Sequence, residues 1–191
     1  MKNIEKYTEI YGAFDNTDCN FYGKIANMFP DGSVFVEIGS FVGRSAICMA
    51  NHLIENKKTK SKIICIDPFT GNPEQGDEIL KTPGLLEKTF LKNTEEYRNL
   101  GVIEVIKGFS LEEAQQFDNN SIDFVFIDGL HDFINVYNDI ELWYSKVKPG
   151  GIVSGHDVHN PYFGVRVAVD KFVSENNKMC AIDENIFWFT K

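Results

Sequence analysis

The chain has few positive charges, and it lacks any long apolar run. Its 191 residues include 19 Lys and Arg against 28 Asp and Glu, so the formal net charge is −9. Surfaces that bind nucleic acid or anionic membranes are basic, so this balance argues against both partners. No apolar run approaches the roughly 20 residues that span a bilayer, and the polar N-terminus lacks the apolar core of a signal peptide. We therefore expect a cytoplasmic protein.

Cysteine is also scarce, and none of the four residues belongs to a C-x-x-C pair. They lie far apart, at Cys19, Cys48, Cys65 and Cys180. This spacing predicts neither a zinc site nor a disulfide framework. Cys48 and Cys65 stand in apolar surroundings, where a small buried thiol is the expected role.

What the chain does contain is typical of one α/β domain, which we assign to residues 1–191. Hydrophobic residues make up 43% and charged residues 25%, an ordinary globular composition. Predicted strands alternate with segments of helical periodicity, at 33–38, 62–67, 102–106, 122–128 and 152–157, and a hairpin follows at 179–182 and 186–190. The order predicts a Rossmann-like, doubly wound, mostly parallel seven-stranded sheet with a C-terminal antiparallel hairpin.

Three further segments complete the predicted organisation. Residues 1–32 form an N-terminal helical arm or cap, with apolar positions over 18–29 on one helical face. Residues 68–84 are rich in Pro and Gly, and both a lid and a surface insertion fit this composition. Residues 85–98 predict a single helix. Ser110 with Glu113 fits a capping box of a short helix. The run Lys148–Gly151 predicts the end of the helix that precedes it.

The first strand runs into a glycine turn and then into a helix. Glu37 lies at the end of the strand, and Gly39 and Gly43 bracket the turn. Glycines let a backbone approach a ligand closely, and the following helix N-terminus offers unpaired N–H groups. This arrangement is typical of a nucleotide-type pocket with room for a ligand beside the glycines.

Acids recur at the ends of four predicted strands, at Glu37, Asp67, Asp128 and Asp157. In doubly wound sheets, ligands bind at the carboxyl ends of the strands, so these acids predict a binding crevice. Like charges gathered there repel unless a cation or a ligand donor offsets them. A carboxylate at Asp67 can accept both hydroxyls of a ribose, although a turn-initiating Asp-Pro pair is the alternative.

The pattern as a whole resembles a known enzyme family. The segment Val36–Ser45 resembles the cofactor loop of class I S-adenosylmethionine (SAM) dependent methyltransferases. The segments Phe126–His131 and Val136–Ile140 are similar to the branch that contains macrolide-sugar and rhamnosyl O-methyltransferases and cephalosporin-hydroxylase-like proteins. Lys148–Gly151, followed by Gly155–Asp157, belongs to the same pattern. The resemblance covers about residues 33–158.

The resemblance implies a cofactor role for several residues. Those at the methionine end of SAM would be Glu37, Gly39, Ser40, Gly43 and Ser45. Asp67 would hold the ribose, Phe109 and Ser110 would lie near the adenine, and Asp128 would also face the cofactor. Phe69 is a further candidate for the adenine face, with core packing as its alternative.

Asp128 and Asp157 match positions that bind Mg²⁺ in metal-dependent members of the family. Here His156 precedes Asp157, which gives a candidate metal set of Asp128, His156 and Asp157. Mg²⁺ prefers oxygen ligands, so the histidine favours Mn²⁺ or Fe²⁺ over Mg²⁺. The alternative is a site without metal in which His156 or His131 acts as the base. A helix-cap or packing role is also open for either histidine.

The predicted function is SAM-dependent O-methylation of a small-molecule hydroxyl. Two alternatives remain: a non-catalytic SAM- or metal-binding module, and an NAD-type oxidoreductase. The latter would need G-x-G-x-x-G, which Gly39–Gly43 does not supply. The aromatic run Phe187–Phe189 predicts core packing or a dimer contact, and a homodimer would help to cover the substrate.

Overall fold

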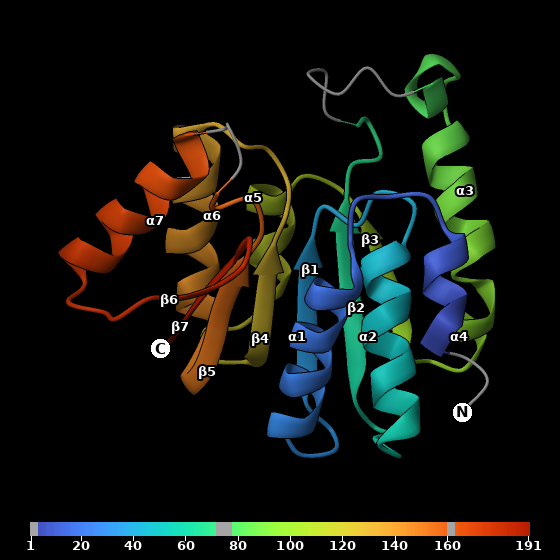
Figure 1. Cartoon of the computed structure of the whole chain (residues 1–191), viewed down its shortest axis with the longest axis horizontal. Helices are drawn as coiled ribbons and strands as arrows, with labels where there is room; N and C mark the ends of the chain where they lie inside the picture. The colour runs from blue at the N-terminus through green and yellow to red at the C-terminus, as the bar shows by residue number, and fades with distance from the viewer. Residues whose placement is uncertain (1–3, 72–77, 160–162) are drawn as a thin grey trace.

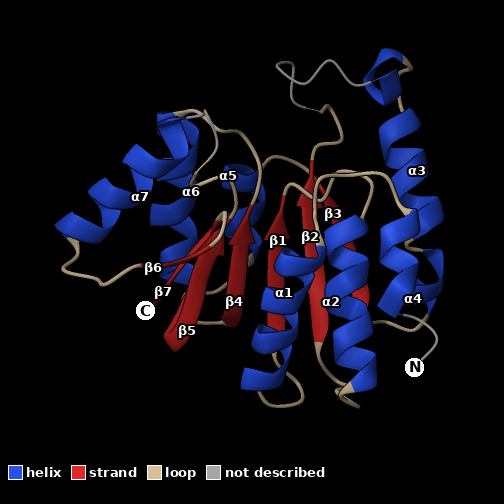
Figure 2. Ribbon diagram, viewed as in Figure 1, coloured by secondary structure: helices blue, strands red, loops and turns tan. Residues whose placement is uncertain are grey.

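The chain folds into a seven-stranded sheet with helices on both faces (Figures 1 and 2). The structure is a computed structural model, and it describes residues 4–71, 78–159 and 163–191. The strand order is β3-β2-β1-β4-β5-β7-β6. Strands β1 to β5 are parallel, whereas β7 is antiparallel to both β5 and β6. The predicted fold class is therefore confirmed. The strands are β1 (Val34–Ile38), β2 (Lys62–Asp67), β3 (Ile103–Lys107), β4 (Ile122–Ile127), β5 (Val147–Gly155), β6 (Ala181–Asp183) and β7 (Ile186–Thr190).

The helices divide between the two faces of the sheet, as Figure 2 shows. One face carries α1 (Asn16–Met28), α2 (Arg44–Glu55), α3 (Leu85–Asn93) and α4 (Glu95–Asn99). The other face carries α5 (Ser110–Glu113), α6 (Phe133–Lys146) and α7 (Phe163–Glu175). Three short 3₁₀ helices complete the described elements, η1 (Ile4–Glu9), η2 (Glu78–Lys81) and η3 (Ala114–Gln116).

Alternation along each strand builds two cores. Phe35 packs into the core beneath α1 and α2, whereas its neighbour Val36 packs into the core beneath α6 and α7. By the same alternation, Glu37 at the end of β1 and Asp67 at the end of β2 share the α1 and α2 face with Phe35. The aromatic run of β7 divides in the same way, since Phe187 and Phe189 are buried in the second core. This confirms core packing for the run.

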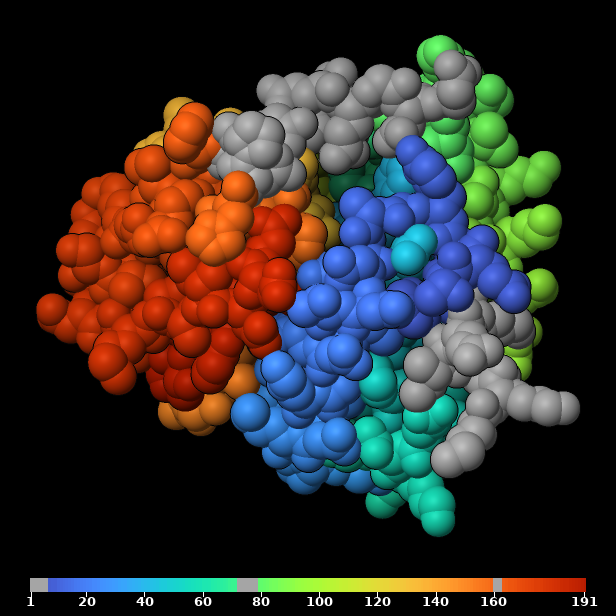
Figure 3. All heavy atoms as spheres, viewed as in Figure 1, coloured from blue at the N-terminus to red at the C-terminus, as the bar shows by residue number. Residues whose placement is uncertain are grey.

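Helix α1 packs on the sheet beside α2, and the N-terminal segment, in blue, occupies the middle of the face seen in Figure 3. A capping box begins the helix: Asp15 accepts hydrogen bonds from the amides of Thr17 and Asp18, and the Asp18 side chain accepts from the Asp15 amide. Tyr22 is fully buried and packs edge-on against Phe126, with ring centroids 5.0 Å apart. The N-terminal helix is thus an integral part of the core.

A disulfide joins α1 to α2 through Cys19 and Cys48. The prediction of a free buried thiol at Cys48 is therefore wrong, and Cys65 alone of that pair is buried and free. The two bonded cysteines are 29 residues apart, and the packing of α1 on α2 brings their Cα atoms within 6.0 Å. Spacing along the chain does not reveal such a pair.

Two boundaries also differ from prediction. The predicted helix 85–98 is divided at Thr94, whose hydroxyl and amide both donate to the carbonyl of Phe90, an arrangement that bends helices. Residues 148–151 end α6 as expected, but they lie within β5, where Gly150 adopts a left-handed φ of 82°. A register shift between β4 and β5 accommodates this stretch.

The predicted lid, residues 68–84, is described only in part, because residues 72–77 lie outside the described residues. Leu80 of η2 packs against the first core. Within the described part of the chain, no helix has the length and apolar character needed to cross a membrane.

Candidate active site

The carboxyl ends of β1, β2, β4 and β5 meet at one edge of the sheet, and the four predicted acids lie there. Backbone hydrogen bonds continue past the strand ends and align the loops. The amide of Gly39 donates to the carbonyl of Ile66, and the amide of Asp128 donates to the carbonyl of Ile38; each hydrogen bond is 2.9 Å long. The loop after β5 is held in the same way, by a bond from the His156 amide to Ile127. We name two parts of this edge after the roles that the resemblance implies: the cofactor end, after β1 and β2, and the reacting end, after β4 and β5.

Glu37 is the most enclosed acid of the cofactor end. It is fully buried, and its Oε2 accepts a hydrogen bond of 2.9 Å from the Tyr22 hydroxyl. Burial raises the pKa of Glu37 to about 7, although the nearby hydroxyls of Ser40, Tyr22 and Ser45 lower it. Its Oε1 and the hydroxyl of Ser40 are buried without a hydrogen-bond partner among the described residues. Buried polar atoms normally have partners, so this pair fits a ligand that carries hydrogen-bond donors.

The two glycines of the turn lie directly against other parts of the protein. Gly39 has a φ of 83°, and a Cβ there would lie 2.1 Å from the carbonyl oxygen of Asp128. Gly43 has a φ of 89°, and its Cβ would lie 2.8 Å from the Thr94 methyl group. We expected these glycines to make room for a ligand, but their near neighbours are protein atoms. Their left-handed backbone shapes the loop and lets neighbouring segments approach closely.

Asp67, at the end of β2, is tied to the loops around it. Its Oδ2 accepts from the Phe41 amide over 2.8 Å, and its Oδ1 accepts from the Phe69 amide over 2.6 Å. Burial raises the pKa of Asp67, and these backbone hydrogen bonds act against the rise. Phe41 and Phe69 both have left-handed φ values, 48° and 55°, a strain that proteins concentrate at functional sites. A carboxylate offers about four acceptor positions, so this one can still accept a hydroxyl.

The three candidates for the adenine differ in their surroundings. Phe69 is buried, with its ring 5.1 Å from that of Phe90, which favours its core-packing alternative. Phe109 is 56% exposed, so its ring is accessible for stacking. Ser110 does not cap α5: it accepts from the Trp143 indole over 2.7 Å and donates to Asp139. The predicted capping box is therefore wrong, because these buried partners take the hydroxyl.

At the reacting end, Asp128, His131 and Asp157 offer ligand atoms that lie within 4.8 Å of one another. Nε2 of His131 is 3.0 Å from Oδ2 of Asp157, and both residues are buried. Burial raises the pKa of Asp128 to about 6, although the charge of His156 lowers it. Asp157 has a left-handed φ of 64°, which no sequence pattern announced.

His156 lies between two carboxylates. Its Nε2 is 3.3 Å from Oδ1 of Asp18, and its Nδ1 is 3.3 Å from Oδ1 of Asp157. Burial lowers the pKa of His156, but the hydrogen bonds to Asp157 and Asp18 outweigh it and raise the pKa to about 11. Both ring nitrogens of His156 thus face carboxylates of the protein. The group of ligand atoms that could share a metal ion contains His131 in place of His156.

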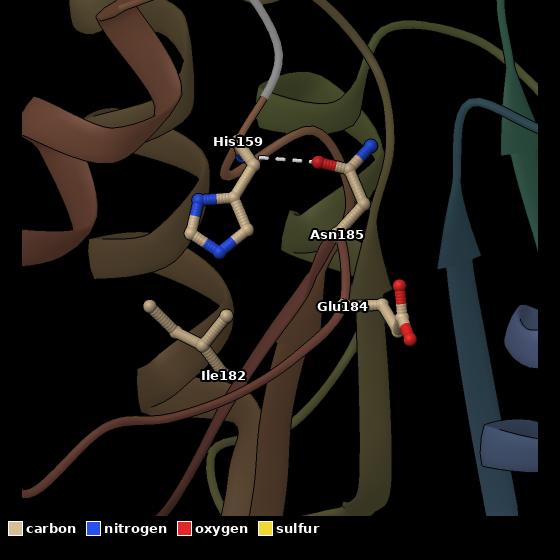
Figure 4. A pocket seen from close by; sticks show the side chains of 4 residues that line it. All are labelled: His159, Ile182, Glu184 and Asn185. Carbon is tan, nitrogen blue, oxygen red and sulfur yellow. Dashed lines mark hydrogen bonds between the residues drawn. The ribbon is translucent and has the colours of Figure 1, made fainter.

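The sequence reasoning missed three residues of the site. Tyr22 and Asp18 come from α1, and only the amphipathic pattern of that helix marked them. Asn185, in the turn between β6 and β7, donates from its Nδ2 to Oδ1 of Asp157 over 3.0 Å. Its own Oδ1 accepts from the His159 amide over 2.9 Å, the dashed line in Figure 4. A cavity of about 670 Å³ opens beside this turn and is lined by His159, Ile182, Glu184 and Asn185.

A protein-family model described as a methyltransferase domain matches residues 36–158. The chain belongs to this family. The prediction of a class I SAM-dependent methyltransferase is thereby confirmed, and the NAD-type oxidoreductase does not agree with it. "Uncharacterized protein R132" of Acanthamoeba polyphaga mimivirus is 33% identical over 159 residues, which make up 79% of this chain. The match spans 64% of the length of that relative.

Solved O-methyltransferases share the fold at low sequence identity. The O-methyltransferase NovP superposes with a TM-score of 0.71 at 18% identity, over 92% of this chain and 79% of NovP. An O-methyltransferase from Bacillus cereus, solved with SAH, gives 0.68 at 17% identity over 100% of this chain and 91% of that chain. TomG from Streptomyces achromogenes, solved with SAM, superposes with a TM-score of 0.63 at 14% identity, over 99% of this chain and 86% of TomG.

Proposed function

We propose that this protein transfers a methyl group from SAM to a hydroxyl oxygen of a small molecule. The observation that carries the proposal is the pairing of His131 with Asp157, 3.0 Å apart, at the strand ends next to the cofactor end. A hydroxyl is a poor nucleophile until it loses its proton, and a carboxylate–imidazole pair is suited to take that proton. The O-methyltransferases that share this fold support the same reaction class.

The residues of the cofactor end fit SAM. The buried, unpartnered oxygens of Glu37 and Ser40 would accept hydrogen bonds from the ammonium group of its methionine end. Ser45, beside Gly43, would complete that end, Asp67 would accept from the ribose, and Phe109 would face the adenine. When bound, SAM supplies an electrophilic methyl group. The protein contributes the position of the two reactants and the exclusion of water.

His131 is the proposed base. Its imidazole is buried, and the facing Asp157 carboxylate fixes the ring and stabilises the positive charge that develops on proton uptake. Asp128 lies beside the pair and gives this end a second carboxylate. In this assignment, His156 is a fixed cation that partly offsets the surrounding acids.

A second mechanism is favoured by the donor set itself. Two carboxylates and one imidazole, from Asp128, Asp157 and His131, would hold a divalent metal, and this set fits Mn²⁺ or Fe²⁺ better than Mg²⁺. A metal there would acidify the substrate hydroxyl as a Lewis acid. His131 would then be a ligand, and it replaces His156 in the predicted metal set.

The acceptor is a small molecule with a free hydroxyl, such as a sugar or a phenol. The hollow beside Asn185 is open to solvent, and Asn185 joins its wall to Asp157. A homodimer and a cytoplasmic location remain parts of this proposal, as does the absence of nucleic-acid and membrane partners.

Calorimetry with SAM and with NAD, followed by turnover assays on a panel of sugar and phenol hydroxyls, tests the proposal. We expect SAM to bind, NAD not to bind, and a methyl ether to form. Binding of SAM without turnover on any acceptor would support the non-catalytic alternative. Activity that survives EDTA supports the mechanism without a metal, whereas activity lost to EDTA and restored by Mn²⁺ supports the metal mechanism.

A further inference from the structure

Four side chains form a continuous chain from helix α1 to the reacting end. Asp18 of α1 faces Nε2 of His156 at 3.3 Å, and Nδ1 of His156 faces Oδ1 of Asp157 at 3.3 Å. The other carboxylate oxygen of Asp157 faces Nε2 of His131 at 3.0 Å. The chain therefore begins at the N-terminal helix, 138 residues away from His156 in the sequence, and ends at the proposed base.

We propose that Asp18 is a positioning residue for methyl transfer: through His156, it holds Asp157 in the orientation that serves His131. The inference rests on the proposed function, since it assigns His131 to the reacting end. Nothing in the family pattern over residues 36–158 includes Asp18, which lies before that segment.

The surroundings of Asp18 suit a fixed support. The residue is 5% exposed, and its two carboxylate oxygens have different partners. Oδ2 accepts a hydrogen bond of 2.8 Å from the backbone amide of Asp15, while Oδ1 faces His156. This backbone amide, which a change of the Asp15 side chain leaves in place, fixes the rotamer of the carboxylate that holds the imidazole.

Helix α1 is itself anchored close to Asp18. Four residues further along, Tyr22 donates to Glu37 in the sheet, and between them Cys19 is bonded to Cys48 of α2. Residues four apart share a helix face, so Asp18 and Tyr22 both point at the strand ends. One turn of α1 therefore contacts the cofactor end and the reacting end together.

Asp157 has a second support on the opposite side. Asn185 donates to the same oxygen, Oδ1, that faces His156. Two donors on Oδ1 leave Oδ2 directed at His131. Loss of the Asp18 contact would leave the His156 ring held at Nδ1 alone, so that Asn185 becomes the better fixed of the two supports of the carboxylate.

The test compares Asp18→Asn with Asp15→Ala. Asp18→Asn keeps an oxygen for the capping box but removes the charge that faces His156. Asp15→Ala removes the exposed cap side chain of the same helix and lowers the stability of that helix, but it keeps the backbone amide that binds Asp18. We expect Asp18→Asn to lower kcat about tenfold to a hundredfold, with an unchanged SAM affinity and KM. Asp15→Ala should keep kcat.

A second readout does not depend on turnover. In ¹⁵N NMR of the imidazole side chains, Asp18→Asn should shift the signals of both His156 and His131, and Asp15→Ala should shift neither. Part of the lost kcat should return in Asp18→Glu, which restores a carboxylate. His131 signals that stay unmoved in Asp18→Asn would overturn the proposal, as would an equal loss of kcat in Asp15→Ala. Wild-type protein that binds SAM but methylates no acceptor would count against the proposed function, while the NMR result would still decide the role of Asp18.

Discussion

The cofactor end and the reacting end are built in different ways. At the cofactor end, Asp67 is held by the backbone amides of Phe41 and Phe69, so local loops set its position. At the reacting end, Asp157 is held by side chains, those of its neighbour His156 and of Asn185 in the turn between β6 and β7. The first arrangement depends on the backbone of the loops that follow β1 and β2. The second depends on side chains, and through His156 it extends to Asp18 of the N-terminal helix.

The two ends also differ in charge. Burial raises the pKa of Glu37 to about 7, and the leading effects that lower it are hydrogen bonds from hydroxyl groups. Burial raises the pKa of Asp128 to about 6, and the charge of His156 is the leading effect that lowers it. The acids of the reacting end thus lie beside a basic side chain, whereas Glu37 lies among hydroxyls. A positively charged ligand such as SAM is therefore better accommodated beside Glu37.

The largest effect that separates the two ends is expected from His131→Asn. The variant removes the proposed base or ligand, so kcat should fall by about a hundredfold to ten-thousandfold. SAM affinity, measured by calorimetry, should stay the same because the cofactor end is untouched. A loss of SAM affinity equal to the loss of kcat would show that the two ends are not separable in this way.

Loss of the disulfide between Cys19 and Cys48 should lower the free energy of unfolding by several kcal/mol. A cross-link between residues 29 apart stabilises by about 3 to 4 kcal/mol in the chain-entropy model. Urea unfolding of oxidised wild-type protein, of reduced wild-type protein and of Cys48→Ala should show this difference. Cys180→Ala, which changes a free cysteine, is the matched control. An identical midpoint for oxidised and reduced wild-type protein contradicts the prediction.

Since α1 carries Asp18 and Tyr22, reduction also tests how much each end depends on that helix. We expect kcat to fall more than SAM affinity, because the contact of Asp18 with His156, at 3.3 Å, is longer than the hydrogen bond of 2.9 Å from Tyr22 to Glu37. The ratio of kcat loss to SAM affinity loss in the reduced protein measures this difference.

Glu37→Gln should remove a loss of stability that the protein without ligand shows as the pH rises. The pKa of Glu37 is raised from 4.5 to about 7 in the folded state, so between these values the folded state binds the extra proton. Stability therefore falls as pH rises through this window, by up to about 3 kcal/mol above pH 7. Glu37→Gln should remove this loss, so the variant should gain on the wild type in urea unfolding at pH 8 and not at pH 4.

The same substitution should weaken SAM binding. An ionised Glu37 favours the ammonium of the cofactor, so wild-type affinity should rise between pH 6 and pH 8, and the variant should lack this rise. Equal pH dependence of affinity in both proteins would remove Glu37 from the cofactor site.

The sequence revealed features whose cause is local. Apolar runs and glycine turns located the strands, and parallel connections then put Glu37, Asp67, Asp128 and Asp157 at one edge. It failed where a contact joins distant segments. The disulfide and the pairing of Asp18 with His156 depend on how α1 packs, which no spacing or periodicity encodes. The predicted capping role of Ser110 was wrong for a related reason, because its hydroxyl bonds to buried partners on α6 instead of to its own helix.

The smallest of these effects concerns Asp67 at the cofactor end. Asp67→Ala removes the proposed acceptor for the ribose hydroxyls, and we expect SAM affinity to fall about tenfold, or about 1.4 kcal/mol. The same carboxylate orders the Phe41 and Phe69 amides, so Asp67→Asn, which keeps one acceptor oxygen, separates loop order from ribose binding. Asp118→Ala changes an exposed acid away from the strand ends and should leave affinity unchanged. Since kcat at saturating SAM depends on the reacting end, it should fall less than affinity in Asp67→Ala. Unchanged affinity by calorimetry would take Asp67 out of the site and leave Glu37 as the acid that binds the cofactor.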